Sequence, residues 1–290
     1  MKYEGMIYRP PSEANSLILQ VAVGCSYNGC TFCHSFQGKT FRIKSFEEIK
    51  EDIDEVSRYG PIPRVFLADG DALIIPQKDL TRILSYLKLK LRGLERVGIY
   101  ANAVDVLKKD VDELRELRAL GLGIIYLGLE SGNAEVLKRI KKNATAEQMV
   151  RAAKRVKEAG IALSITVLLG IGGVELSREH AEDTGKVLSE MDPEFVGALS
   201  LILVPGTPIE RDLASGRLVL PTPFELIREL GTMIANCRFT NCFFASNHAS
   251  NYLPLRIRMP EEKEKALDLI RKVLEKKDPD LLRPEYMRAL

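Results

Sequence analysis

The chain has 290 residues, which is enough for one large domain or two small ones. Its 42 basic and 40 acidic residues leave a net charge of only +2, so the composition gives no sign of a nucleic-acid partner. Residues 1–5 do not have the pattern of a signal peptide, and the longest apolar run is far shorter than the roughly 18 residues that span a membrane. We therefore expect a soluble cytoplasmic protein.

Short apolar runs rich in β-branched residues alternate with longer segments whose apolar residues recur at helical spacing. The short runs predict strands at residues 17–23, 64–68, 96–101, 123–129, 162–169 and 195–204. Ser45 and Glu48 form a capping-box pattern that opens the first helix, which we expect to run to about residue 58. Further helices are predicted at about 80–87, 111–120, 145–159, 177–190 and from residue 222 onward.

Six strands in β-α alternation predict a parallel sheet with right-handed crossovers. Polar or glycine-rich residues follow every one of these strands. In a barrel the carboxyl ends of all strands meet at one mouth, whereas in an open doubly wound sheet only the loops at the switch point meet. The six polar strand ends therefore favour an α/β fold of the partial (β/α)6 TIM-like barrel type over an open sheet.

The β-α pattern weakens after about residue 216. We expect residues 1–216 to form the barrel core. Residues 217–290 are expected to form a mainly helical C-terminal extension that packs on the core and is not an independent domain. The apolar stripe of its last helix, at residues 261–277, indicates that this helix packs against the barrel as a cap.

Cys25, Cys30 and Cys33 stand within nine residues, directly after the first predicted strand. Three thiolates on one loop can hold three irons of a four-iron cluster and leave the fourth iron open to a small molecule. A structural zinc site is an alternative, but it normally needs a second pair of ligands about 12–20 residues later, and the next cysteine is Cys237. Residues 30–34 also match the attachment pattern for c-type haem, which leaves Cys25 without a role.

This loop resembles that of the radical SAM enzymes, which use S-adenosylmethionine as a radical source. Their commonest motif is Cys-x3-Cys-x-aromatic-Cys on the loop after the first barrel strand. Here the spacing is Cys-x4-Cys-x2-Cys, which occurs in some branches of the superfamily, and Phe32 takes the aromatic place before Cys33. The resemblance extends over about residues 17–208.

The resemblance implies an enzyme that binds a [4Fe-4S] cluster and S-adenosylmethionine. Such an enzyme cleaves S-adenosylmethionine reductively to a 5′-deoxyadenosyl radical that acts on a substrate, which the sequence does not identify. It also implies a low-potential electron donor of the ferredoxin or flavodoxin type. A noncatalytic iron–sulfur protein, for electron transfer or cluster binding, is the alternative function.

The resemblance also assigns roles to residues at the predicted strand ends. Cys25, Cys30 and Cys33 would ligate the cluster, and Phe32 would shield it or pack near the adenine. Asp69, Gly70 and Asp71 replace a Gly-Gly-Glu-like turn that holds the methionyl amino group. The residues expected near the ribose, the carboxylate and the adenine are Asn102, Glu130, Ser131 and Gly170, with Glu175 as an uncertain match to an acidic residue of the family motif.

Five further residues attract attention in the sequence. His248 and Asn247 follow an apolar run and are candidates for substrate contact, with a structural histidine as the alternative. Cys237 and Cys242 could ligate an auxiliary cluster or lie in the core. His180 belongs to a highly charged helical segment, so we expect it to face solvent.

Overall fold

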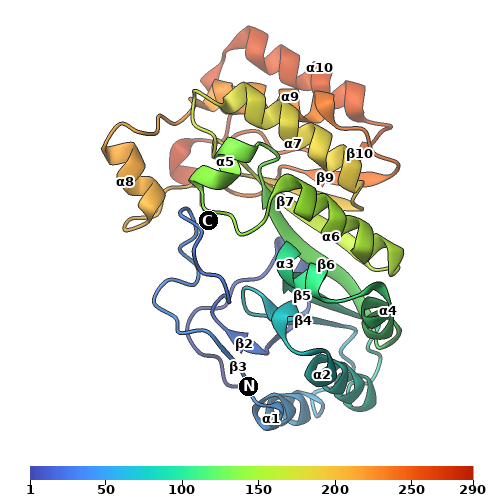
Figure 1. The fold of residues 1–290 in the computed structure, drawn as a ribbon. Coiled ribbons are helices and arrows are strands. Elements are labelled where there is room, and N and C mark those ends of the chain that lie inside the picture. Colours follow the sequence, from blue (N-terminus) through green and yellow to red (C-terminus); the bar gives the residue numbers. More distant parts are fainter. Residues whose placement is uncertain (290) are drawn as a thin grey trace. The chain divides into compact units, whose positions relative to one another are not determined.

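A computed structural model describes residues 1–289, and its contacts divide the chain into two compact units (Figure 1). Unit 1 comprises residues 1–28, 33–127 and 151–163. Unit 2 comprises residues 29–32 and 128–150, together with the chain from residue 164 onward. This division differs from the one expected at residue 216, which stays a prediction.

Unit 1 is built on parallel strands in the order β1, β4, β5 and β6, with each strand apolar and largely buried. Its strands are β1 (Leu17–Gln20), β4 (Arg64–Ala68), β5 (Arg96–Ala101) and β6 (Leu122–Glu130), whose last residues lie in unit 2. Its helices are η1 (Pro11–Glu13), α1 (Phe46–Val56), η2 (Ala72–Ile74), α2 (Gln77–Lys90), α3 (Ala103–Lys108), α4 (Val111–Ala119) and most of α6 (Ala146–Glu158). Ser45 and Glu48 do form the predicted capping box at the start of α1.

The first predicted strand is divided in the structure. β1 ends at Gln20, and a separate β2 (Ala22–Val23) pairs antiparallel with β3 (Arg42–Ile43). The break lies at Val21, whose N–H still donates to the carbonyl of Ala68 on β4 while its carbonyl accepts from Lys44. A single apolar run, interrupted only by Gln20, therefore serves two sheets, which the hydrophobic pattern alone does not reveal.

Unit 2 continues the β-α alternation with parallel strands in the order β7, β8 and β9, followed by an antiparallel β10. Its strands are β7 (Ala162–Leu169), whose first residues lie in unit 1, β8 (Phe195–Ser200), β9 (Cys242–Ala245) and β10 (Arg256–Met259). Its helices are α5 (Ala134–Arg139), α7 (Ser177–Met191), α8 (Pro208–Ala214), α9 (Pro223–Asn236), α10 (Lys263–Lys276), η3 (Pro279–Leu281) and η4 (Glu285–Met287). The C-terminal region thus adds two strands to the sheet as well as helices.

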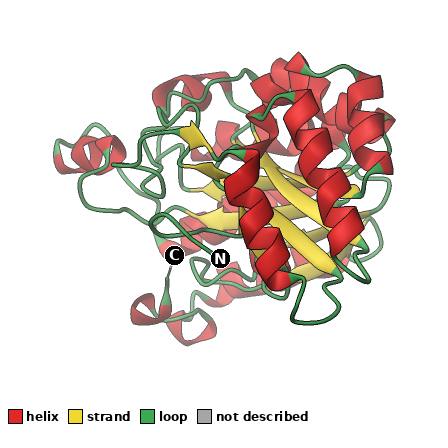
Figure 2. Ribbon diagram, turned by 90° about the horizontal axis from the view of Figure 1, so that it is seen from below, coloured by secondary structure: helices red, strands yellow, loops and turns green. Residues whose placement is uncertain are grey.

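The parallel strands with intervening helices confirm the predicted α/β fold (Figure 2). Within residues 1–289, β1 and β10 each pair with one strand only, so no pairing closes a full barrel, as expected for a partial one. β8 ends at Ser200 rather than at residue 204, although the N–H of Leu201 still donates to the carbonyl of Leu169 on β7. No helix of residues 1–289 is long and apolar enough to cross a membrane.

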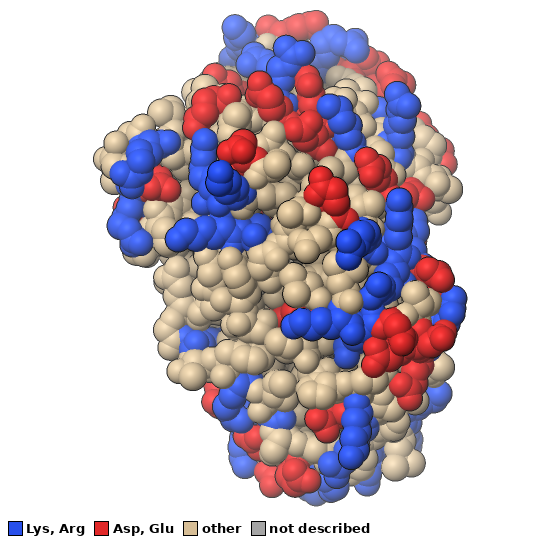
Figure 3. Space-filling model, in the orientation of Figure 1, with Lys and Arg blue, Asp and Glu red and all other residues tan. Residues whose placement is uncertain are grey.

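Helices α7, α9 and α10 lie side by side in unit 2 (Figure 1). The approach of α7 to α9 depends on Gly185, where an added Cβ would lie 2.6 Å from Cβ of Asn236 and 2.7 Å from the carbonyl oxygen of Met233. Ile270 of α10 fits against Gly231 of α9 in the same way. Over α9 and α10 basic and acidic side chains are intermixed, in keeping with the balanced composition (Figure 3).

We predict that Gly185→Ala destabilises the protein by about 1–3 kcal/mol, because the new methyl group meets backbone that cannot move away cheaply. Urea unfolding followed by circular dichroism would measure the change. Gly197→Ala on β8 is the matched control, since the nearest atom to its added Cβ is 3.8 Å away. Equal stability of the two variants would contradict this account of the α7–α9 packing.

Candidate functional site

The cysteines divide into two classes in the structure. None of the five forms a disulfide; Cys25, Cys30 and Cys33 are partly exposed, whereas Cys237 and Cys242 are buried. Among residues 1–289, no three His, Cys, Asp or Glu side chains are gathered closely enough to hold a metal ion. The three loop thiols are therefore accessible, but the ligand set remains a prediction.

Asp69, directly after β4 in unit 1, is a fully buried carboxylate. Its Oδ2 accepts hydrogen bonds from the backbone N–H of Gly24 and from Nζ of Lys39, both at 3.0 Å. Its Oδ1 is buried and has no hydrogen-bond partner within residues 1–289. Asp69 thus holds the residue before Cys25 with one oxygen and keeps a second acceptor available.

Asp71, two residues further along, joins two other predicted site residues. Its Oδ2 accepts from the hydroxyl of Ser26 at 2.5 Å and from Nδ2 of Asn102 at 2.9 Å, while Oδ1 accepts from the Asn102 backbone N–H at 3.2 Å. Burial, together with the neighbouring carboxyl of Asp105, raises the pKa of Asp71 to about 7. The structure therefore brings Asp71 and Asn102 together, as predicted, and adds Ser26, which follows Cys25.

Gly70 lies between these two carboxylates, where an added Cβ would come within 2.4 Å of the ring of Phe36. Phe36 is itself nearly buried and belongs to the segment that follows the cysteines. Glycine is required at position 70 because the aromatic ring already fills the space of a side chain. The turn after β4 thus contacts the residues on either side of Cys25 and, through Phe36, the segment that follows Cys33.

In unit 2, residues 29–32 are fastened by backbone hydrogen bonds. The Thr31 N–H donates to the carbonyl of Ile140 at 3.0 Å, and the Thr31 carbonyl accepts from the N–H of Ile209 at 3.1 Å. Phe32 packs against an apolar cluster that includes Leu168 and Ile171. Phe32 therefore lies beside the segment that precedes and follows Gly170.

Glu130 ends β6 with a φ of 64°, a left-handed conformation that is uncommon for a residue other than glycine. Its Oε1 accepts from Nζ of Lys142 at 3.0 Å, and both side chains are largely buried. Gly128 leaves room for this ion pair, since an added Cβ would lie 2.1 Å from Oε1. Backbone strain at a strand end often marks a functional position.

Lys142 is the functional candidate that sequence reasoning missed. The sequence pattern does not distinguish Lys142 from Lys141, because the two lysines are adjacent and both follow a short helix. Only the fold shows that Lys142 is the lysine that reaches the carboxylate of Glu130.

The expectation that His180 faces solvent is wrong, because it is fully buried between helices α7 and α9. Its Nδ1 lies 2.8 Å from the hydroxyl of Ser131, and its Nε2 lies 3.5 Å from Oε1 of Glu229. Burial lowers the pKa of His180 to about 4 and raises the pKa of Glu229 to about 7. The charged residues that suggested exposure occupy the other faces of α7.

His248 and Asn247, the candidates for substrate contact, each have a partner within the structure. Nδ1 of His248 is hydrogen-bonded to the hydroxyl of Ser250 at 2.9 Å, and burial together with the cation of Arg283 lowers the pKa of His248. The amide oxygen of Asn247 accepts from the guanidinium of Arg256 at 2.8 Å. Contact of either residue with substrate stays a prediction.

Three further sequence candidates are also accounted for in the structure: two are buried in the core, and the third forms an ion pair. Burial raises the pKa of Cys237 to about 12, and it raises that of Cys242 as well, so both behave as core thiols. Glu175 forms an ion pair with Arg139 at 2.9 Å.

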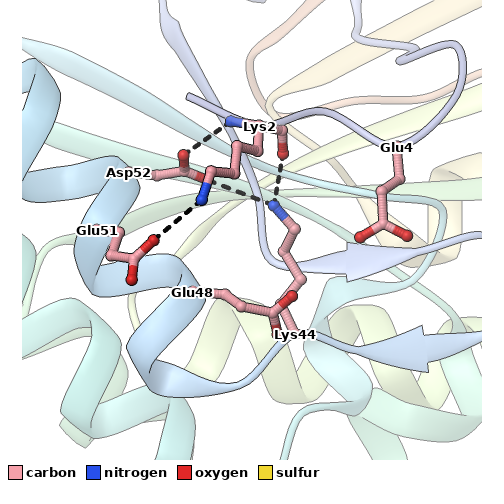
Figure 4. A pocket seen from close by; sticks show the side chains of 6 residues that line it. All are labelled: Lys2, Glu4, Lys44, Glu48, Glu51 and Asp52. Atoms are coloured by element: carbon pink, nitrogen blue, oxygen red, sulfur yellow. Dashed lines mark hydrogen bonds and ion pairs between the residues drawn. The ribbon is translucent and has the colours of Figure 1, made fainter.

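A separate pocket in unit 1 is lined by charged side chains that satisfy one another (Figure 4). Lys44 lies 3.3 Å from Asp52 and donates to the carbonyl of Lys2 at 2.7 Å, while Nζ of Lys2 lies 3.3 Å from Glu51. Because these charges are already paired, the pocket offers little to a charged ligand, and it contains none of the predicted site residues.

Comparison with known proteins identifies the relatives of this chain. A family model described as the Radical SAM superfamily matches residues 19–186. The anaerobic magnesium-protoporphyrin IX monomethyl ester cyclase of Rubrivivax gelatinosus is 25% identical over 236 residues, which cover 81% of this chain and 38% of the relative. The tRNA-2-methylthio-N(6)-dimethylallyladenosine synthase of Dehalococcoides mccartyi is 26% identical over 219 residues, which cover 73% and 51% respectively.

Solved structures show the same fold. Coproporphyrinogen III oxidase from Escherichia coli, described as a radical SAM enzyme, superposes with a TM-score of 0.56 at 16% identity, over 76% of this chain and 51% of that one. The radical S-adenosylmethionine methyltransferase TsrM from Kitasatospora setae gives a TM-score of 0.57 at 19% identity, over 69% and 39%. The chain spans between about a third and a half of the curated relatives described above.

The raised pKa of Glu229 predicts how the free energy of unfolding depends on pH. A carboxyl group whose pKa rises from 4.5 to about 7 on folding stabilises the fold fully below pH 4.5, and this contribution is lost as the pH rises to 7. Glu229→Gln cannot ionise, so its stability relative to the wild type should increase by up to about 3 kcal/mol between pH 5 and pH 8. Anaerobic thermal unfolding across this range measures the difference, and a gap independent of pH would contradict the prediction.

Proposed function

Because this chain belongs to the Radical SAM superfamily, we propose that it is an enzyme that binds a [4Fe-4S] cluster and S-adenosylmethionine. The superfamily uses both groups. The observation that carries the proposal is the position of the three cysteine thiols: they lie within the family match, directly after the first strands, on a segment held by the carboxylates that follow β4.

The residues present fit both groups. Thiolates are the ligands of iron–sulfur clusters, and the three loop thiols are partly exposed rather than sealed in the core. The buried Oδ1 of Asp69 lacks a donor within residues 1–289, in the turn that the resemblance assigns to the methionyl amino group. An ammonium group is a suitable donor for such an acceptor, because a charge-assisted hydrogen bond would compensate its burial.

When bound, the two groups would supply one-electron cleavage of a carbon–sulfur bond and a radical for the substrate. The protein's own contribution is binding and orientation. Cys25, Cys30 and Cys33 would hold the cluster, and Asp69 would orient the amino group. Asp71 would keep Ser26 and Asn102 in place through the hydrogen bonds that it accepts.

Glu130 and Lys142 would act together toward S-adenosylmethionine. The ion pair fixes the direction of the Glu130 carboxylate, so that its second oxygen can accept from a ribose hydroxyl. Phe32 would contribute an apolar face beside the adenine, and Gly170 would contribute a backbone segment that has no side chain. These roles follow from the resemblance and are consistent with the local geometry within unit 2.

We propose no specific substrate for this chain, and we propose the electron donor only as a class of protein. The named relatives act on different substrates, and this chain covers only part of each, so no single substrate is transferred. Enzymes of this superfamily generally need a reductant, and we propose a protein donor of the ferredoxin or flavodoxin type. The cytoplasmic location expected from the sequence stays a prediction.

Anaerobic reconstitution tests the cluster and the activity together. The wild type should take up about four irons per chain and, with dithionite and S-adenosylmethionine, should release 5′-deoxyadenosine and methionine. Cys33→Ala should lose most of the iron and the cleavage activity. Cys237→Ala is the matched control, because this cysteine is buried and lies outside the cysteine loop, so its variant should keep both.

If the protein takes up about four irons per chain but cleaves no S-adenosylmethionine with any reductant, the proposal that it is an enzyme is contradicted. A Cys33→Ala variant that keeps a full cluster and its activity would contradict the ligand assignment.

We also predict that Glu130→Ala weakens the binding of S-adenosylmethionine about tenfold while the iron content stays unchanged, because a buried, charge-assisted acceptor is removed. Lys142→Met should act in the same direction, since it releases Glu130 from its orientation. Isothermal titration of the reconstituted protein measures both effects. Glu135→Ala, on the exposed first turn of α5, is the control and should bind normally.

A further inference from the structure

Unit 2 contains a buried histidine–glutamate pair outside the residues assigned to the cofactors. His180 on α7 and Glu229 on α9 are both almost completely shielded from solvent, and Nε2 of His180 lies 3.5 Å from Oε1 of Glu229. Burying two ionisable groups is costly unless each is hydrogen-bonded, so the partners of this pair indicate its role.

The histidine binds the loop after β6. Its Nδ1 lies 2.8 Å from the hydroxyl of Ser131, and that hydroxyl oxygen already accepts from the backbone N–H of Asn133 at 3.0 Å. The hydroxyl of Ser131 can therefore donate its proton to Nδ1 of a neutral imidazole. Nε2, 3.5 Å from Oε1 of Glu229, is buried and has no hydrogen-bond partner within residues 1–289. The low pKa of His180 agrees with this neutral form.

The glutamate binds the loop after β7. Its Oε1 accepts from the backbone N–H of Gly170 at 2.6 Å, and its Oε2 accepts from the hydroxyl of Ser177 at the start of α7. Gly170 has a φ of 80°, and an added Cβ would lie 2.9 Å from Leu226 on α9. The backbone of this loop is therefore held against α9 by a hydrogen bond and by close packing.

Other contacts reinforce the first of these attachments. The N–H of Gly132 donates to the hydroxyl oxygen of Thr184 at 2.8 Å, and Nδ2 of Asn133 donates to Asp183 at 2.8 Å. An added Cβ at Gly132 would lie 2.5 Å from the carbonyl oxygen of Asp183. Helix α7 thus fixes the loop after β6 at three consecutive residues.

We propose that His180 and Glu229 are a positioning pair that holds the loops after β6 and β7 in a fixed relation, so that Ser131 and the Gly170 backbone are preorganised for S-adenosylmethionine. The inference rests on the proposed function, because it assumes that these two loops contact that ligand. The pair itself touches neither cofactor. It acts through Ser131 and Gly170, whose positions it determines within unit 2.

Comparing Glu229→Leu with Glu229→Gln tests whether the Glu229 side chain positions the Gly170 loop or only fills space in the core. Leucine fills the space but leaves the Gly170 N–H buried without an acceptor, whereas glutamine still offers an oxygen to it. In the reconstituted protein, Glu229→Leu should raise the Kd for S-adenosylmethionine about tenfold at unchanged iron content, and Glu229→Gln should stay within about twofold of the wild type. Isothermal titration measures both.

His180 supplies a second comparison that does not depend on how Glu229→Leu folds. Asparagine can present a polar atom near the position of Nδ1, whereas leucine cannot, so His180→Leu should weaken binding more than His180→Asn. Ile234→Ala is the matched control, because this fully buried residue of α9 has an apolar side chain that forms no hydrogen bond to either loop. It should lower stability without changing the Kd.

Amide hydrogen exchange gives a readout that needs no bound ligand. In Glu229→Leu, segments 129–134 and 168–173 should exchange faster than in the wild type, while Glu229→Gln and Ile234→Ala should show wild-type exchange in these segments. Equal Kd values for the leucine and glutamine variants, or unchanged exchange in Glu229→Leu, would overturn the inference while leaving the proposed function intact. A wild-type holoprotein that binds no S-adenosylmethionine would overturn both.

Discussion

A buried carboxylate must accept hydrogen bonds, and in this chain the donors come from the loops that follow the strands. Asp69 and Asp71 in unit 1 accept from the backbone of Gly24, the hydroxyl of Ser26 and the backbone and side chain of Asn102. Glu229 in unit 2 accepts from the backbone of Gly170. Each carboxylate is costly to bury alone, so its presence fixes the loops that satisfy it.

This constraint gives the strand-end loops a defined shape before any ligand arrives. The cysteine segment is tied through its first residues to the turn after β4 and through Thr31 to unit 2 segments. The loops after β6 and β7 are tied to α7 and α9. Preorganised loops are useful for radical chemistry, because a ligand that is held in one orientation exposes its reactive bond in one direction and excludes water.

Much of the fold follows from the sequence because the relevant signals are local. The apolar runs predicted β4, β5 and β7 to the residue, and the pairs Ser45–Glu48 and Thr222–Glu225 opened helices as capping boxes. The errors have tertiary causes. Val21 lies in a mainly apolar run yet marks the point where the chain passes from one sheet to the other. β10 carries too few apolar residues for its pairing with β9 to be read from its pattern.

The sequence by itself supplied the residues on which the proposed function rests: three closely spaced cysteines, carboxylates after β4 and at the end of β6, and glycines after β7 are all readable as residue types at strand ends. The tertiary structure decided which polar residues support those positions. His180 stands among charged neighbours and Lys142 stands beside another lysine, so their local patterns indicate exposed side chains. Burial against α9 and the reach to Glu130 depend on the packing of elements distant in the chain, which local sequence does not encode.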